Sequence, residues 1–133
     1  MRILRSVAAV VIGLGFMAAT ATVGTLLASA VLGAPQSPGG SPAYLLINLL
    51  TGGVGAVLGG WLCARIASFA PYGHAAVMAA IVGVLSITTA TGPAAPGQPG
   101  WYPSAIVLVA VFGILLGGKL RAAAAAASGR VIA

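Results

Sequence analysis

The sequence contains no acidic residue. Among its 133 residues there is no Asp and no Glu, and six Lys and Arg residues give a formal net charge of +6. Only 5% of the residues are charged, whereas a soluble domain carries roughly 25%. A composition so poor in charge excludes an ordinary soluble globular domain.

Residues that carry out chemistry are equally scarce. His74 is the only histidine and Cys63 the only cysteine, so the chain cannot form an intrachain disulfide or a cysteine-based metal cluster. Acid–base and metal-dependent catalysis brings several carboxylates, histidines or cysteines together. We therefore expect no enzyme, with no catalytic residue, no metal and no cofactor. Two interpretations of His74 stay open, an anchor facing lipid headgroups and a proton relay or pH sensor.

Apolar residues are abundant instead. They make up 60% of the chain, whose mean hydropathy is +1.14, and they form four segments at about 6–32, 43–67, 72–91 and 102–120. Each segment is long enough to cross a bilayer. The sequence predicts an all-α integral membrane four-helix bundle, with residues 1–133 forming a single transmembrane domain. Polyalanine after the fourth segment predicts a cytoplasmic helical extension over about 121–128.

The basic residues predict the orientation. An uncharged loop rich in Pro and Gly, around Gln36, joins the first segment to the second, and a similar loop around Gln98 joins the third to the fourth. All six cations lie at the opposite ends of the segments: Arg2, Arg5, Arg65, Lys119, Arg121 and Arg130. Lys and Arg concentrate in cytoplasmic loops. We expect both termini in the cytoplasm and the protein in the bacterial inner membrane, with the lipid bilayer as its surroundings and no nucleic-acid partner.

The start of the chain also resembles a secretory signal. Met1 to Arg5 is basic, and Ala28-Ser29-Ala30 resembles a cleavage site. A signal peptide has an apolar core of about 7 to 15 residues, and the first segment is longer. This favours an uncleaved membrane span.

Small residues recur at helical spacing in every segment. Helices in membranes associate by close packing of such residues, so we expect helix-packing positions at Gly15, Gly52, Gly55, Gly59, Gly83, Gly113 and Gly117. The second segment carries two small-residue faces, one with Asn48, Gly52, Gly55 and Gly59 and the other with Gly53, Ala56, Gly60 and Ala64. We expect this helix to pack against two neighbours.

Two glycine-rich stretches match each other. Gly55-Ala-Val-Leu-Gly-Gly-Trp-Leu62 and Gly113-Ile-Leu-Leu-Gly-Gly-Lys-Leu120 share the pattern Gly-x-x-Leu-Gly-Gly-x-Leu. One interpretation is a pair of parallel helical-hairpin repeats, with the first two segments repeated as the last two.

Polar side chains gather in the outer half of the predicted spans. They form a candidate polar pocket consisting of Asn48, Thr51, Thr22, Thr25 and Thr88. A buried amide or hydroxyl is costly unless it is paired, so we expect Asn48 to point inward and to bond with a hydroxyl of another segment. Two readings stay open: interhelical hydrogen bonding alone, or a shallow pocket for a small neutral or anionic ligand.

The stretch Gly97-Gln-Pro-Gly-Trp-Tyr-Pro103, leading into Leu116-Gly-Gly-Lys-Leu-Arg121, resembles small bacterial four-span inner-membrane proteins. The resemblance brings no site residues. Four-span multidrug exporters depend on a membrane glutamate, which this chain lacks. Fluoride channels of similar size use clustered phenylalanines, whereas Phe16, Phe69 and Phe112 are scattered.

These observations favour a non-catalytic structural or accessory membrane protein that associates through its small-residue helix faces. Its partner would be another membrane protein or further copies of itself. The alternative is an oligomeric channel or carrier for a small neutral or anionic solute.

Overall fold

A computed structural model describes residues 2–33, 41–67, 69–94 and 96–129. The described chain forms five helices and confirms the all-α class: α1 (Arg2–Leu32), α2 (Pro42–Ala67), α3 (Pro71–Leu85), α4 (Ile87–Thr91) and α5 (Tyr102–Ala127). The predicted loop around Gln36, the connection at Ser68 and the basic residue Arg130 lie outside the described residues.

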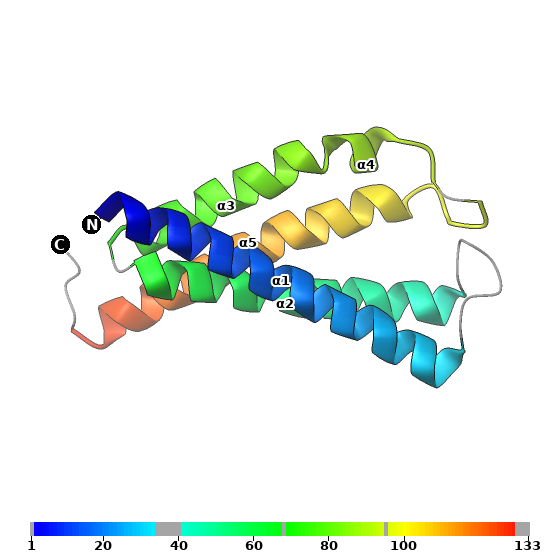
Figure 1. Ribbon diagram of the computed structural model, residues 1–133, viewed down its shortest axis with the longest axis horizontal. Coiled ribbons are helices and arrows are strands. Elements are labelled where there is room, and N and C mark those ends of the chain that lie inside the picture. The colour runs from blue at the N-terminus through cyan, green and yellow to red at the C-terminus, as the bar shows by residue number, and fades with distance from the viewer. Residues whose placement is uncertain (1, 34–40, 68, 95, 130–133) are drawn as a thin grey trace.

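Three of these helices are long and apolar enough to cross a membrane, namely α1, α2 and α5. They pack as a bundle (Figure 1), and the chain is a multi-pass membrane protein. The expectation of four continuous spans needs correction at the third segment. The helix predicted over 72–91 divides at Ser86 into α3, a shorter apolar helix, and the five-residue α4.

The division at Ser86 has a local cause. Ser86, Ile87, Thr88 and Thr89 follow one another, and hydroxylated and β-branched residues are weaker helix formers than Ala or Leu. Helical hydrogen bonds continue on both sides of the break, since the Ser86 N–H donates to the Val82 carbonyl at 2.9 Å and the Ala90 N–H to the Ser86 carbonyl at 2.9 Å. The helix is therefore interrupted at Ser86, where φ is −93° and ψ is 3°, without losing these hydrogen bonds.

The central helix of the bundle is α2. It packs against α1 on one side and α5 on another, and it also contacts α3, which lies against α5. Figure 1 shows α1 and α3 close together near the N-terminal end of α1 and diverging towards the other end of the molecule. The last turns of α5 lie at the same end as the start of α1, and the described connection over 96–100 lies at the opposite end.

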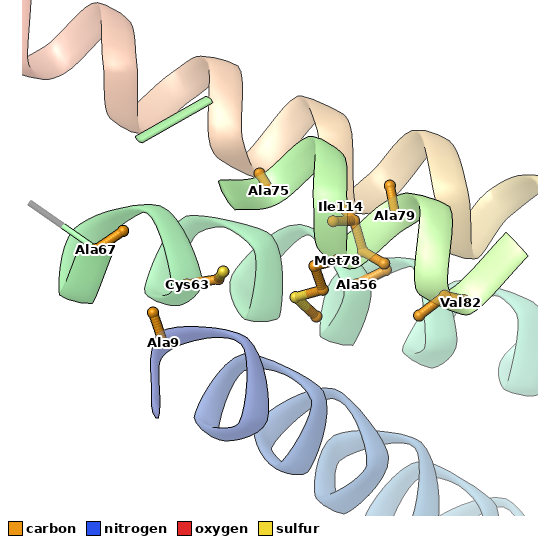
Figure 2. Close-up of a cluster of buried hydrophobic side chains, with 9 residues drawn as sticks. All are labelled: Ala9, Ala56, Cys63, Ala67, Ala75, Met78, Ala79, Val82 and Ile114. Carbon is orange, nitrogen blue, oxygen red and sulfur yellow. The ribbon is translucent and has the colours of Figure 1, made fainter. Parts of the chain in front are cut away.

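Small side chains build the core between the helices. Ala56, Cys63 and Ala75 are fully buried, and Met78 and Ile114 are the largest side chains that solvent does not reach (Figure 2). Many large apolar side chains point outward instead, including Val11, Leu26, Leu85, Leu108 and Phe112. Small residues inside and large apolar residues outside are the reverse of a soluble core. A bilayer favours this distribution, because lipid tails solvate large apolar side chains while close helix contact needs small ones.

Two cations pack against the ends of helices. Arg5 Nε donates to the carbonyl oxygen of Ile66 at 2.9 Å, which satisfies one of the unpaired carbonyls in the last turn of α2. The Arg65 guanidinium lies 5.1 Å from the centre of the Trp61 ring, in cation–π range. The first helix is thereby attached to the end of the second.

Candidate functional site

The contact between α1 and α2 is built on glycines. A Cβ at Gly59 would lie 2.8 Å from the carbonyl oxygen of Gly13, and one at Gly55 would lie 3.0 Å from Thr20 Cβ. A Cβ at Gly24 would collide with the side chain of Thr51. The two backbones therefore approach more closely than any side chain at these positions would permit.

The contact between α2 and α5 uses a different face of α2. A Cβ at Gly113 would lie 2.8 Å from Ala56 Cβ. A Cβ at Gly117 would collide with the carbonyl oxygen of Val57, and one at Gly60 with that of Ile114. The face expected from Gly53, Ala56, Gly60 and Ala64 thus meets α5, while the face with Gly55 and Gly59 meets α1.

The remaining predicted packing glycines lie elsewhere. Gly15 is exposed, and a Cβ at Gly15 or at Gly52 would have nothing within 4 Å. A Cβ at Gly83 would make ordinary contact with Val111 Cγ2 at 3.7 Å. Within the bundle, the structure brings Gly55, Gly59, Gly113 and Gly117 into close contacts and leaves Gly15 and Gly52 outside them.

The side of α1 that meets α2 was missed by the sequence analysis. It carries Ala9, Gly13, Met17, Thr20, Gly24 and Ala28, at spacings of three and four. This spacing was a readable signal. The stripe predicted instead, which has the same spacing and an equally small composition, reaches α2 only at Thr25 among the described contacts; it runs through Ala8, Val11, Gly15, Ala18, Thr22, Thr25 and Ser29. Sequence spacing alone could not choose between these two faces.

Asn48 contacts a hydroxyl of another helix, as expected. Thr25 Oγ1 lies 2.9 Å from Asn48 Oδ1 and 3.0 Å from the Ala21 carbonyl oxygen of its own helix, so its single proton is shared between these two acceptors. Thr51 instead bonds the Ile47 carbonyl at 2.8 Å, and Thr22 the Ala18 carbonyl at 2.9 Å, each within its own helix. Thr88 is exposed on α4. The described contacts join Asn48 and Thr25 but do not gather the five residues around one cavity.

A second polar contact, at the opposite end of the bundle, joins α1 to α3. His74 Nε2 lies 3.0 Å from Ser6 Oγ, and His74 Nδ1 lies 3.1 Å from the carbonyl oxygen of Ala70. The ring also meets Phe69 edge to face, with centroids 4.9 Å apart. His74 is therefore half-buried between helices, with both ring nitrogens engaged. Its partner Ser6, 68 positions earlier, gave no sequence signal.

Comparison with known proteins adds no further information about the site. No protein-family model, curated protein or solved structure matches the chain. The molecule is, by its fold, a small helical membrane protein with three candidate spans.

Proposed function

We propose that this protein is a non-catalytic structural or accessory subunit of the bacterial cytoplasmic membrane, which associates with a membrane partner or with further copies of itself through α1. The observation that carries this proposal is the open face of α1 around Gly15. A Cβ at Gly15 would meet nothing within 4 Å, whereas one at Gly13 would lie 2.9 Å from the Gly59 carbonyl. Residues two apart on a helix point in nearly opposite directions.

The position of α1 in the bundle supports the same proposal. It lies at one edge, with α2 along one side and α3 near one end, and makes no contact with α5 among the described residues. Its open side carries Gly15, Ala18 and Ala19, all of which are exposed. A second helix can approach closely where such small residues lie on a lipid-facing surface.

The experiment is affinity isolation of the tagged chain from its native membranes in mild detergent, combined with light scattering. We expect wild-type protein to carry a reproducible partner or a second copy, and Gly15→Leu to lose it with unchanged thermal stability. Gly52→Leu is the matched control, because Gly52 has equally open space on α2. A monomeric wild type without a partner, or full retention by Gly15→Leu, contradicts the proposal.

We also propose that α3 and α4 together make the fourth crossing, with both termini in the cytoplasm. From Pro71 to Thr91 the two helices rise about 31 Å at about 1.5 Å per residue, close to the roughly 30 Å of a bilayer core. The grouping of Arg5, Arg65, Lys119 and Arg121 towards one end of the bundle supports this orientation. The resemblance to four-span inner-membrane proteins is consistent with it.

The alternative function, an oligomeric channel or carrier for a small neutral or anionic solute, is favoured by one observation. The helix broken at Ser86 lies in the same half of the bundle as the bond between Asn48 and Thr25 and the bond from Ser104 Oγ to the Ala90 carbonyl, 3.0 Å long. Polar side chains within membrane spans mark solute pathways in many transport proteins. Solute flux into proteoliposomes that Asn48→Leu abolishes would favour this alternative over the accessory subunit.

The parallel hairpin repeat also remains a proposal. In space, α1 lies next to α2, α2 next to α5, and α5 next to α3. A two-fold axis between α2 and α5 would therefore exchange the hairpin of α1 and α2 with the hairpin of α3 and α5, which supports the repeat. The matched glycines face different neighbours, however: Gly59 meets α1 and its counterpart Gly117 meets α2, while Gly60 meets α5 and Gly118 meets Ala75 of α3. If the two hairpins arose by duplication, α2 or α5 has since rotated about its own axis relative to its neighbours.

A further inference from the structure

An apolar groove lies between α1 and α3, along the N-terminal half of α1 and most of α3. Its volume is about 690 Å³, and its walls include Val7, Val10 and Leu14 of α1 and Val77 and Ile81 of α3. Met78, fully buried, fills the space between the helices on the inner side, and its sulfur would lie 2.9 Å from a Cβ at Gly13. The α1/α3 groove is therefore a slot on the surface of the bundle with a closed back.

One end of the groove is polar. The contact between His74 Nε2 and Ser6 Oγ, at 3.0 Å, joins the two walls there. Arg5 precedes Ser6 and is exposed, with its Nε held by the Ile66 carbonyl. A guanidinium carries five N–H donors and suits phosphate. Because the chain contains no Asp or Glu, no side chain of its own can supply the counter-charge to Arg5.

The length of the groove distinguishes between possible occupants. The stretch from Val7 to Leu14 rises about 10 Å, and that from Gly73 to Ile81 about 12 Å, at about 1.5 Å per residue. A bilayer core is about 30 Å thick, so one leaflet contributes about 15 Å. A partner helix would need a groove through both leaflets, whereas an acyl chain that starts at the polar end needs only one.

We propose that the α1/α3 groove binds one acyl chain of an anionic phospholipid of the cytoplasmic leaflet, with the headgroup phosphate beside Arg5. The apolar walls hold the chain, the bond between Ser6 and His74 closes the groove at headgroup level, and Arg5 provides the positive charge. Basic pockets between transmembrane helices on the cytoplasmic side are known to hold anionic headgroups. This lipid would remain with the protein while the surrounding lipids exchange.

A second apolar groove provides the control. It lies between α2 and α5, has a volume of about 420 Å³, and is lined by residues such as Leu49, Val54 and Val109 without any polar or basic side chain. Val54 is 56% exposed and Val77 is 54% exposed. Val54→Phe and Val77→Phe therefore place the same ring in two grooves, of which only the α1/α3 groove is lined by polar side chains, Ser6 and His74, with Arg5 next to Ser6 in the chain.

The test is native mass spectrometry of purified protein in mild detergent, titrated with phosphatidylglycerol or phosphatidylcholine of the same acyl chains. We expect one phosphatidylglycerol to bind in preference to phosphatidylcholine. Val77→Phe should weaken its binding by about fivefold or more through overpacking, and Val54→Phe should not. Arg5→Gln should reduce the preference about fivefold, the effect of one cation at a membrane surface, and Arg5→Lys should retain it. Arg65→Gln is the charge control at the same end.

Three results would overturn the proposal. The first is equal binding of the two lipids by wild-type protein, and the second is equal weakening by Val54→Phe and Val77→Phe. The third is a dimer that Val77→Phe dissociates, because a second copy would then occupy the groove. Thermal unfolding of each variant in detergent separates loss of lipid from loss of fold, and an unfolded Val77→Phe would be replaced by Val10→Phe on the opposite wall.

Discussion

Gly13 of α1 and Gly59 of α2 lie directly against each other's backbone. A Cβ at Gly13 would stand 2.9 Å from the Gly59 carbonyl oxygen, and a Cβ at Gly59 would stand 2.8 Å from the Gly13 carbonyl oxygen. Real Cβ contacts are essentially never that short, and the opposing atom is backbone, which cannot rotate away. Even a methyl group must therefore separate the two helices.

This relationship predicts that Gly59→Ala destabilises the bundle by about 1 to 3 kcal/mol, the usual cost of overpacking. Gly52→Ala is the control, because nothing lies within 4 Å of its added methyl, and it should stabilise the helix by about 0.5 to 1 kcal/mol through propensity alone. Thermal unfolding in detergent, followed by circular dichroism, measures both. Equal stability of the two variants would show that α1 and α2 are farther apart than described.

The contact between α2 and α5 makes a second prediction. Gly117→Ala should lower the midpoint of thermal unfolding, since its Cβ would collide with the Val57 carbonyl. Gly83→Ala should raise it slightly, since its Cβ meets Val111 at 3.7 Å without a clash and alanine is the better helix former. Both substitutions raise helix propensity equally. A difference between them therefore reports packing alone.

The bond between Thr25 and Asn48 should contribute about 0.6 kcal/mol to stability, the average for an interhelical hydrogen bond in a membrane. A double-mutant cycle with Thr25→Val and Asn48→Leu measures the coupling between the two residues. Thr22→Val combined with Asn48→Leu is the matched cycle and should show none, because Thr22 and Thr25 each bond a carbonyl of their own helix but only Thr25 also contacts Asn48. Additive effects of Thr25→Val and Asn48→Leu would contradict the pairing.

Ala70 has a left-handed backbone, with φ of 41°. This conformation costs a residue with a Cβ roughly 1 to 2 kcal/mol. Ala70→Gly should therefore raise the unfolding temperature, although the greater freedom of glycine in the unfolded chain offsets part of the gain. Ala80→Gly, at an exposed position within α3, should lower that temperature. If both substitutions are destabilising, Ala70 does not adopt the left-handed conformation.

The orientation is tested by cysteine labelling. Cys63 is buried and can be replaced by Ala in every variant to remove background. In intact spheroplasts, an impermeant maleimide should label Gln98→Cys and should not reach Ser128→Cys until the membrane is permeabilised. The reverse pattern would place both termini outside.

Sequence spacing indicated the two glycine faces of α2, because both of its neighbours pack on small residues, but it also included Gly52, which meets no neighbouring helix. It failed on α1, where Gly13 and Gly15 lie on opposite faces and only the position of α2 decides which one is used. In a soluble helix the polar side would have revealed the outer face, whereas lipid accepts apolar residues on every side. The break at Ser86 depends on weak local helix preferences, and the contact between Ser6 and His74 depends on how α1 packs against α3. The spacing of small residues predicts neither.

Because α2 packs against both α1 and α5, its two glycine faces are covered at different times during synthesis of the chain. When α2 leaves the ribosome, α1 is already available for its Gly55 and Gly59 face, but the face with Gly60 still lacks its partner. About 50 residues separate Ala67 from Gly117, so at roughly 5 to 20 residues per second that face meets only lipid for several seconds. During this interval the nascent hairpin of α1 and α2 presents a vacant glycine surface, which an insertion factor or another nascent chain would have to leave free for α5.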